Sequence, residues 1–278
     1  MDKMTENSLE NFEVLVFGCG QMGSAILKGV LESEVLPTSR LIGFDRNEDA
    51  LRWASDLGIM TIRVHEQRPL LPESTGLKRI LVFAVKPQGV APLIRSLGDQ
   101  IRHDDYLVSI AAGVTLEVLQ KAHSGHARLV RAMPNTPARV GAGVTGLYGE
   151  DGVDIEPVRQ LFSSIGEVVE LSQEKDFHAL TAISGSGPAY VFTALEALGD
   201  AGVLLGLSRN IANQLAISMV EGAARLAREE QKRPAALREE VTSPGGTTIA
   251  ALAALEEHGF RHSLIEAVRR AAKRSEEM

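Results

Sequence analysis

A glycine-rich turn at the first strand–helix junction constrains the fold of this chain more than any other feature. Val14–Phe17 is a short apolar run, and Gly18-Cys19-Gly20-Gln21-Met22-Gly23 follows it. Apolar residues then recur at helical spacing from Met22 to Val30. In the pattern Gly-x-Gly-x-x-Gly, the first glycine permits a tight turn, the second lets backbone approach a pyrophosphate, and the third lets helix pack on strand. The segment therefore predicts a strand, a turn and a helix that together bind a dinucleotide.

Apolar strand-like runs alternate with helical patterns through the first 172 residues. Such runs are typical of a parallel sheet that helices cover on both faces. Beyond residue 174 the alternation stops, and alanine- and leucine-rich helical stretches follow at 190–198 and 211–226. We therefore expect an α/β Rossmann-type domain over residues 1–172 and an all-α helical domain over residues 173–278. The expected strands are 14–17, 41–44, 80–85, 107–110, 129–132 and 167–171, and the expected helices are 22–30, 48–57, 89–97, 116–122 and 155–164.

The helices of the second domain are apolar nearly all round. Roughly a hundred residues enclose too little interior to bury every apolar face, so we expect a partner subunit to cover the rest. Small residues such as Gly199, Gly202, Ala216 and Gly222 would let helix backbones approach closely. A self-contained bundle is the alternative. The pattern favours a homo-oligomer that associates through its C-terminal helices.

Charge and cysteine content argue against several classes of protein. The formal net charge is −7 and no basic tract occurs, whereas nucleic-acid binding needs clustered Lys and Arg. No apolar run approaches the roughly 20 residues that span a bilayer, so no membrane partner is expected. Cys19 is the single cysteine, which precludes an intrachain disulfide, and the opening residues 1–13 lack a secretory pattern. A reducing cytoplasm is the expected location.

Asp45 and Arg46 follow the second expected strand and leave the choice of cofactor open. Asp45 comes after Gly23 at close to the spacing of about 20 residues at which an acidic side chain accepts from the ribose 2′-hydroxyl of NAD. Arg46 can instead hold the 2′-phosphate of NADP by a charge-assisted, bidentate contact if Asp45 turns away. The sequence predicts NAD or NADP without deciding between them.

Three further segments end expected strands on the same side of the sheet. Val85-Lys86-Pro87 and Ile110-Ala111-Ala112 lie at carboxyl ends, where open α/β sheets bind ligands, so we expect both to flank the nicotinamide ribose. A solvated loop cation is the alternative for Lys86. Met133-Pro134-Asn135-Thr136-Pro137 follows the next strand, and its two prolines stiffen a loop that either walls the nicotinamide pocket or forms a structural turn.

A second glycine-rich loop, Thr242-Ser243-Pro244-Gly245-Gly246-Thr247-Thr248, interrupts the helical C-terminal third. It provides free backbone N–H groups and hydroxyls just ahead of a helix expected near Ile249. Helix N-termini attract anions through unpaired N–H groups and the helix macrodipole, so this loop predicts a small substrate that carries a carboxylate. N-capping of the helix is the alternative role for Thr247 or Thr248.

The absence of lysine from one long segment bears on whether the enzyme reduces a carbonyl or an imine. Ser184–Tyr190 opens a long helix, and many two-domain dehydrogenases of hydroxy acids place a lysine about one turn into such a segment to protonate an alkoxide. Here no lysine lies between Lys175 and Lys232. Hydride addition to a protonated imine gives a neutral amine and needs only a weak proton donor. A threonine hydroxyl suits that demand, which makes Thr248, with Thr247 beside it, the first candidate for orienting an imine nitrogen.

Other titratable residues do not form a recognisable site. Glu196 and Asp200 are four residues apart on one helix face without a nearby histidine, which suits a salt bridge or a cap better than a metal. The seven histidines are scattered without ligand spacing, and none adjoins a serine or cysteine in a nucleophilic arrangement. We expect no metal centre.

The chain resembles the pyrroline-5-carboxylate reductase family over nearly its whole length after the opening dozen residues. The loop that contains Thr242–Thr248 is the most diagnostic of the matching segments. The segments that carry the resemblance are Gly18-Cys19-Gly20-Gln21-Met22-Gly23, Ala84-Val85-Lys86-Pro87-Gln88, Met133-Pro134-Asn135-Thr136-Pro137, Ser184-Gly185-Ser186-Gly187-Pro188-Ala189-Tyr190 and Val241–Thr248.

The resemblance implies reduction of 1-pyrroline-5-carboxylate to L-proline, with NADPH or NADH bound by the N-terminal domain. It also implies that the C-terminal helices interlock two subunits, so that the threonine loop meets the partner's cofactor domain. The substrate carboxylate is then expected on Ser243, Gly245, Gly246 and Thr247, with Thr248 bound to the imine nitrogen. Expected cofactor contacts are Gly18, Cys19, Gly20, Gln21, Met22, Gly23, Asp45, Arg46, Ala84, Val85, Lys86, Pro87, Ile110, Ala111 and Ala112.

Two other functions are also compatible with the sequence. A hydroxy-acid dehydrogenase of similar architecture is disfavoured by the missing lysine. A non-catalytic dinucleotide sensor is disfavoured by the intact threonine loop, which a sensor has no need to retain.

Overall fold

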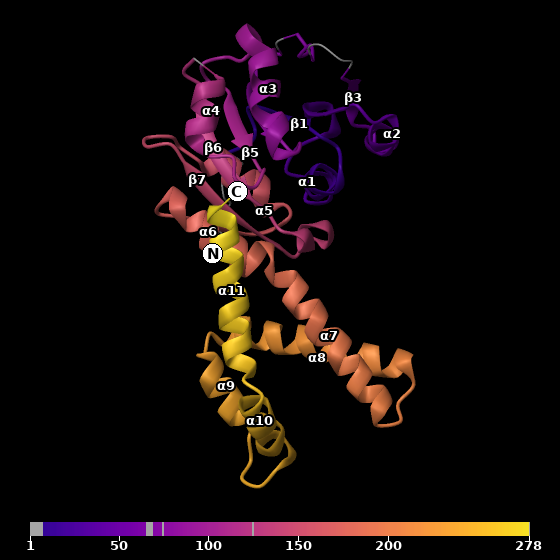
Figure 1. Ribbon diagram of the computed structural model, residues 1–278. Coiled ribbons are helices and arrows are strands. Elements are labelled where there is room, and N and C mark those ends of the chain that lie inside the picture. Colours follow the sequence, from indigo (N-terminus) through magenta and orange to yellow (C-terminus); the bar gives the residue numbers. More distant parts are fainter. Residues whose placement is uncertain (1–7, 65–68, 74, 124, 278) are drawn as a thin grey trace, which may run out of the picture. The chain divides into compact units, whose positions relative to one another are not determined.

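The structure is a computed structural model that describes residues 8–64, 69–73, 75–123 and 125–277 (Figure 1). The chain divides into two compact units, one formed by Met1–Gly185 with Arg274–Met278 and the other by Ser186–Lys273. The segment 173–185, which the sequence assigns to the helical domain, packs with the first unit. Opening residues 1–7, part of the stretch judged to lack a secretory pattern, lie outside the described residues.

The first unit is built on one eight-stranded sheet with the order β3-β2-β1-β4-β5-β6-β7-β8. Neighbouring strands are parallel except β6 and β7, which pair antiparallel. The expectation of a parallel sheet is therefore right for its main part and wrong at this pair, because a short loop returns the chain directly beside β6. The strands are β1 Phe12–Phe17, β2 Leu41–Asp45, β3 Met60–Arg63, β4 Lys78–Phe83, β5 Tyr106–Ser109, β6 Arg128–Met133, β7 Gly143–Gly149 and β8 Gly166–Glu170.

Helices cover both faces of this sheet and create two apolar cores. In β1, Val14 and Val16 face one core while Leu15 and Phe17 face the other, as the two-residue period of a strand requires. Helices α1, α2 and α5 supply the first core, and α3 and α4 supply the second, where they lie over β5 and β6 in Figure 1. The helices of this unit are α1 Gln21–Glu32, α2 Glu48–Asp56, α3 Pro87–Leu97, α4 Leu116–Ala122, α5 Glu156–Ser163 and α6 Phe177–Leu180, with short turns η1 Thr38–Arg40, η2 Gly98–Gln100, η3 Thr136–Val140, η4 Glu174–Asp176 and η5 Thr181–Gly185.

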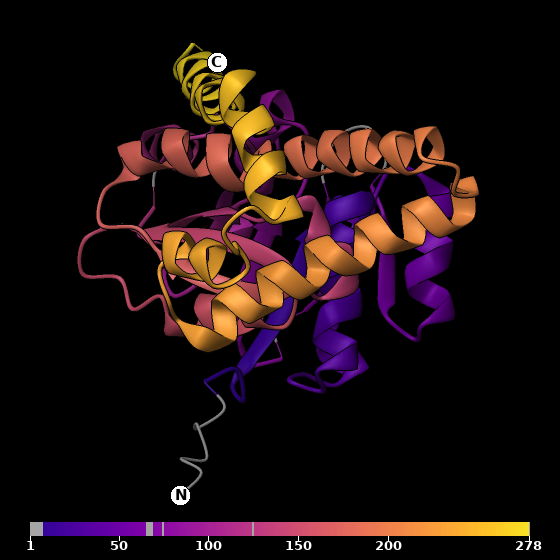
Figure 2. The same cartoon turned by 90° about the horizontal axis from the view of Figure 1, so that it is seen from below.

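The described residues of the second unit form helices joined by short loops, and no strand occurs among them. Its elements are α7 Gly187–Leu204, α8 Arg209–Glu230, α9 Pro234–Glu240, α10 Thr247–Glu257 and most of α11 Phe260–Glu276. Figure 2 shows α7 and α8 as a helical hairpin. The two helices pack closely at Gly202, where an added Cβ would lie 2.6 Å from Cβ of Ala212. Asp200 of α7 pairs with Arg209 of α8 at 2.6 Å, so this carboxylate serves a salt bridge.

Large apolar side chains remain exposed on the second unit. Among the residues described there, α7 buries Gly199 alone and α10 buries none. Leu204, Leu205 and Ile265 are among the most exposed. The self-contained bundle is therefore wrong, because these helices leave apolar faces for a partner to cover. Within the described residues, no helix combines the length and the apolar character needed to cross a membrane.

Candidate active site

The glycine-rich turn has the geometry that a phosphate-binding turn needs. Gly18 has φ +99°, and a Cβ there would lie 2.7 Å from the carbonyl oxygen of Ala84. A Cβ on Gly23 would overlap the carbonyl oxygen of Gly18, so this glycine allows α1 to start against the strand. Gly20, the N-cap of α1, is exposed, and no atom of the described residues lies within 4 Å of its added Cβ. The turn thus leaves open space at the one glycine that faces a pyrophosphate in this motif.

Asp45 braces this turn from the end of β2. Its Oδ2 accepts a hydrogen bond from the backbone N–H of Cys19 at 2.7 Å, and its Oδ1 accepts from the N–H of Asn47 at 2.8 Å. The N–H of Gly18 donates to the carbonyl of Phe44 at 2.7 Å. Both carboxylate oxygens are therefore already bonded to the chain itself, while each retains acceptor capacity for a further donor.

Cys19 lies inside the turn as a buried, neutral side chain. Its Sγ donates to the carbonyl of Phe44 at 3.8 Å. Burial, assisted by the negative charge of Asp45, raises the pKa of the thiol to about 12. The thiol fills space between β1 and β2 and is not available as a nucleophile at neutral pH.

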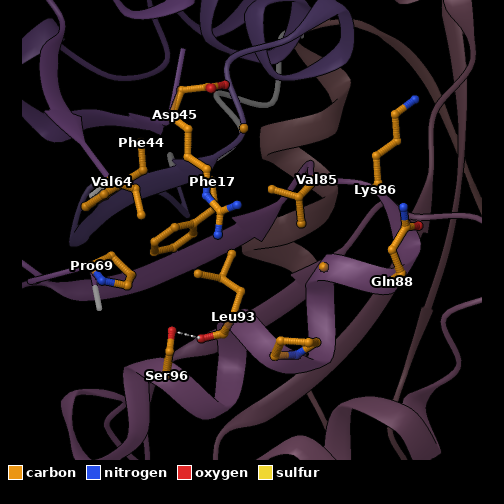
Figure 3. A pocket seen from close by; sticks show the side chains of 14 residues that line it. Phe17, Phe44, Asp45, Val64, Pro69, Val85, Lys86, Gln88, Leu93 and Ser96 are labelled. Carbon is orange, nitrogen blue, oxygen red and sulfur yellow. Dashed lines mark hydrogen bonds between the residues drawn. The ribbon is translucent and has the colours of Figure 1, made fainter. Parts of the chain in front are cut away.

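A cavity of about 540 Å³ opens beside the glycine turn (Figure 3). Apolar side chains form its floor, where the Phe17 ring stacks on Phe44 at 4.5 Å between centroids and on Phe83 at 5.3 Å. The exposed cation Arg46 and the exposed cation Lys86 both line it. The lining residues are Phe17, Gly18, Phe44, Asp45, Arg46, Val64, Pro69, Val85, Lys86, Gln88, Gly89, Pro92, Leu93 and Ser96.

Five of the residues predicted to contact the cofactor meet in this cavity, namely Gly18, Asp45, Arg46, Val85 and Lys86. The others lie at the same carboxyl edge of the sheet without lining it. The N–H of Ala84 donates to the carbonyl of Phe17 at 2.8 Å, and the N–H of Ile110 donates to the carbonyl of Phe83 at 3.3 Å. The remaining predicted residues beside this edge are Cys19, Gly20, Gln21, Met22, Gly23, Pro87, Ala111 and Ala112.

Sequence reasoning missed the apolar half of the cavity. Phe44, Val64 and Leu93 line it but resemble any other core residue in the sequence. Phe44 carried one usable signal, because it immediately precedes Asp45, the last residue of β2, and so stands near the edge where ligands bind.

The threonine loop has the predicted conformation ahead of α10. Gly245 has φ +69°, and the N–H of Gly246 donates to the carbonyl of Ser243 at 3.1 Å. Within the described residues of this loop, Gly246 is the N-cap and no side chain caps the helix, so the alternative capping role of Thr247 and Thr248 is wrong. Thr247 begins α10, and the first-turn N–H groups of this helix are left for another acceptor.

The described residues contain no group of three or more His, Cys, Asp or Glu placed to hold a metal ion. This agrees with the pairing of Asp200 with Arg209.

Comparisons with known proteins match both units. A family model described as "Pyrroline-5-carboxylate reductase dimerisation" matches residues 174–278, and one described as "NADP oxidoreductase coenzyme F420-dependent" matches residues 13–113. The second match covers the glycine turn and Asp45, and the first covers the threonine loop.

Individual relatives agree with these family models. The chain is 41% identical over 272 residues to the pyrroline-5-carboxylate reductase of Pisum sativum, covering 97% of each chain. A solved structure of a pyrroline-5-carboxylate reductase from Coxiella burnetii matches with TM-score 0.87 and 33% identity, covering 96% of this chain and 98% of that one. The Plasmodium falciparum pyrroline carboxylate reductase, solved with NADP bound, matches with TM-score 0.79 and 28% identity, covering 96% and 97%. Because these similarities extend along nearly the whole chain, it belongs to the pyrroline-5-carboxylate reductase family.

Proposed function

We propose that this protein reduces the cyclic imine 1-pyrroline-5-carboxylate to L-proline with NADPH or NADH, as an oxidoreductase of proline biosynthesis. The observation that carries the proposal is full-length similarity to relatives named for this activity, together with a cofactor-type turn in one unit and an anion-type loop in the other.

The first unit supplies the cofactor site. The open face of Gly20 is suited to a pyrophosphate, and the cavity beside Phe17, Phe44 and Asp45 is suited to an adenosine group. Arg46 and Lys86 bring positive charge toward a 2′-phosphate or the bridging phosphates. When bound, the reduced nicotinamide supplies the hydride for the C=N bond.

The second unit supplies the substrate site. Ser243, Gly245, Gly246 and Thr247 bind the carboxylate in this proposal, because the N-terminus of α10 carries unpaired N–H groups and a positive dipole end. Thr248 follows in the first turn, where its hydroxyl orients the imine nitrogen. No lysine between Lys175 and Lys232 provides the strong donor that an alkoxide needs, so the hydroxy-acid alternative loses support.

The protein assembles as a homo-oligomer through its C-terminal helices, which match the dimerisation family over residues 174–278. We assign residues 1–172 to dinucleotide binding and residues 173–278 to dimerisation and substrate binding, and we place the enzyme in the cytoplasm. The single cysteine, Cys19, is a buried free thiol that forms no disulfide, which suits a reducing compartment.

An activity assay with the purified full-length protein tests the function. Mixing it with NADPH or NADH and 1-pyrroline-5-carboxylate should consume the reduced cofactor and form proline in equal amounts. A 2-oxo acid offered in place of the imine should give no turnover. Failure to oxidise either cofactor with the imine would refute the proposal, and binding of cofactor without turnover would favour the sensor.

A further inference from the structure

A π-helical turn lies at the end of the first unit. Residues Thr181–Gly185 form this turn between α6 and α7, and Ser186, the next residue, begins the second unit. A π-helical turn has wider i→i+5 bonds than an α-helix, is rare, and is stable only where its surroundings hold it. The chain therefore needs contacts that keep this turn from relaxing into an ordinary helix.

The carboxamide of Asn135 makes two such contacts. Asn135 lies in the loop after β6 and is only 8% exposed. Its Nδ2 donates to the carbonyl of Ser184 at 3.0 Å, and its Oδ1 accepts from the N–H of Val144 at 2.9 Å. One side chain thus ties the π-helical turn to both the β6–β7 loop and the start of β7.

Weak and apolar contacts also hold the same turn. The Thr181 hydroxyl lies 3.9 Å from Sδ of Met133, and a Cβ on Gly185 would lie 3.5 Å from Cε of Met133. Leu180 fills the space where a Cβ on Gly146 would stand. The Ser184 hydroxyl donates to the carbonyl of Leu180 at 3.1 Å within the same stretch of helix. The carboxamide of Asn135, by contrast, binds the carbonyl of Ser184 from a separate segment and so holds the backbone of this turn in a defined direction.

The turn lies at the edge where we place the nicotinamide. β5 and β6 are parallel with Ser109 opposite Arg131, so Ile110 and Met133 leave the sheet at the same edge. Asn135 follows Met133 by two residues and holds Ser184 there.

We propose that Asn135 is a positioning residue for hydride transfer. This proposal rests on the function proposed above, and it gives Asn135 no contact with reacting atoms. Without the amide donor, the Ser184 carbonyl loses its partner and the turn can lose its extra residue to α-helical register. A one-residue change of register shifts the following backbone by about 1.5 Å and about 100° around the helix axis. A misplacement of about 1 Å at a reacting centre can lower the rate by about a hundredfold.

The variant Asn135→Asp tests this with little change of shape. Its carboxylate keeps the acceptor for Val144 and replaces the donor to Ser184 with an oxygen. We expect kcat to fall roughly ten- to a hundredfold, while KM and the dissociation constant for NADPH stay within about twofold. We also expect the isotope effect on kcat from NADPH deuterated at the transferred position to increase, because the hydride step becomes slower.

Tyr106→Phe is the matched control. Tyr106 is 3% exposed and its hydroxyl donates to the carbonyl of Asp154 at 2.8 Å, so this variant also removes one buried side-chain-to-backbone bond. Tyr106 begins β5 and therefore lies at the opposite, amino edge of the sheet. Both variants should lose some stability, but only Asn135→Asp should change kcat and the isotope effect.

Hydrogen exchange provides a readout that does not need the substrate. Amides of residues 181–187 should exchange faster in Asn135→Asp than in the wild type or in Tyr106→Phe. Asn135→Ser, which carries no charge, repeats the test if the aspartate variant does not fold. Wild-type kcat and isotope effect in a folded Asn135 variant, equal kinetic losses in Tyr106→Phe, or loss of folding in both Asn135 variants would each overturn the proposal. An inactive wild type would instead refute the proposed function, while exchange at 181–187 would still decide the anchoring role.

Discussion

Nη1 of Arg131 lies 3.2 Å from Oε1 of Glu174, and the same carboxylate oxygen accepts from the backbone N–H of Leu116 at 2.8 Å. Arg131 is buried on β6, and its guanidinium also covers the ring of Phe177 at 4.2 Å. Burial lowers the pKa of Arg131, and the charge of Glu174 opposes that shift. The pair therefore fastens the start of α4 and the segment before α6 to strand β6.

Replacing Glu174 with Gln should destabilise the protein by roughly 2 kcal/mol, because the buried charge of Arg131 loses its partner. The loss should be smaller than for a fully enclosed pair, since the Glu174 side chain is 28% exposed. Urea unfolding measures the change. Glu156→Gln is the control, because its pair with Arg159 is exposed at both ends and such pairs contribute about 0.5 kcal/mol or less. Equal midpoints for the two variants would contradict this account.

Cys19 should be inert in the folded protein. With a pKa of about 12, roughly one thiol in ten thousand is ionised near pH 8, so a chromogenic disulfide reagent should react only after unfolding in urea. Cys19 is the single cysteine, so the colour reports this site alone. Rapid reaction of the native protein would show that the thiol is accessible.

The same group predicts how stability depends on alkaline pH. Folding raises the thiol pKa from the ordinary 9.0, so the unfolded chain releases its proton first as pH rises. The stabilising contribution is complete below pH 9 and is lost between pH 9 and about 12. Cys19→Ala should therefore show a shallower loss of unfolding free energy over that range than the wild type.

The sequence predicted the elements with strong local signals and missed those without them. Six of the strands were predicted. β1, β2, β4 and β5 were predicted because a buried parallel strand is apolar at nearly every position, and β6 because its apolar run is interrupted by Arg131 alone. β8 was predicted from its Val168-Val169 pair, although most of Gly166–Glu170 is not buried. β3 was missed because Met60–Arg63 is half-exposed at the sheet edge, and β7 was missed because Gly143–Gly149 contains three glycines.

The same distinction between strong and absent local signals applies to the residues of the candidate site. Gly18, Asp45 and Lys86 could be found because their chemistry and spacing are distinctive. The bracing of the turn by Asp45 and the anchoring of Ser184 by Asn135 could not, because each joins residues far apart in sequence through a single side chain.

Arg46 should decide how strongly the enzyme distinguishes its two cofactors. If the guanidinium binds a 2′-phosphate, Arg46→Ala should weaken NADPH roughly tenfold or more while changing NADH little, because the lost contact is charge-assisted. Titration of each reduced cofactor by fluorescence gives both constants. Arg52→Ala is the control, since Arg52 is an exposed arginine of α2 that pairs with Asp49 outside the cavity. Equal weakening of NADH and NADPH would show that Arg46 does not contact the 2′-phosphate.

Thr248 should affect turnover without affecting the fold. Thr248→Ala removes the hydroxyl proposed to orient the imine nitrogen, so we expect kcat to fall roughly ten- to a thousandfold with an unchanged unfolding midpoint. Thr242→Ala is the control from the same loop, because the Thr242 hydroxyl already donates to the carbonyl of Arg238 at 2.6 Å. Steady-state kinetics at varied imine concentration gives kcat and KM for both variants, and only Thr248→Ala should show the loss of kcat. Unchanged kinetics in Thr248→Ala would remove this residue from the proposed mechanism.

Gly20 and Gly23 separate the binding role of the glycine turn from its structural role. An alanine Cβ at Gly20 lies more than 4 Å from every atom of the part of the chain that the structure describes, so Gly20→Ala should fold normally. It should nevertheless bind NADPH at least roughly tenfold more weakly, because the methyl group occupies the face offered to the pyrophosphate. An alanine at Gly23 collides with the carbonyl of Gly18. Gly23→Ala should therefore also lower the free energy of unfolding, by roughly 2 kcal/mol or more. Thermal unfolding with and without NADPH measures both effects. If Gly20→Ala bound NADPH as well as the wild type does, the pyrophosphate would have to lie elsewhere than on this turn.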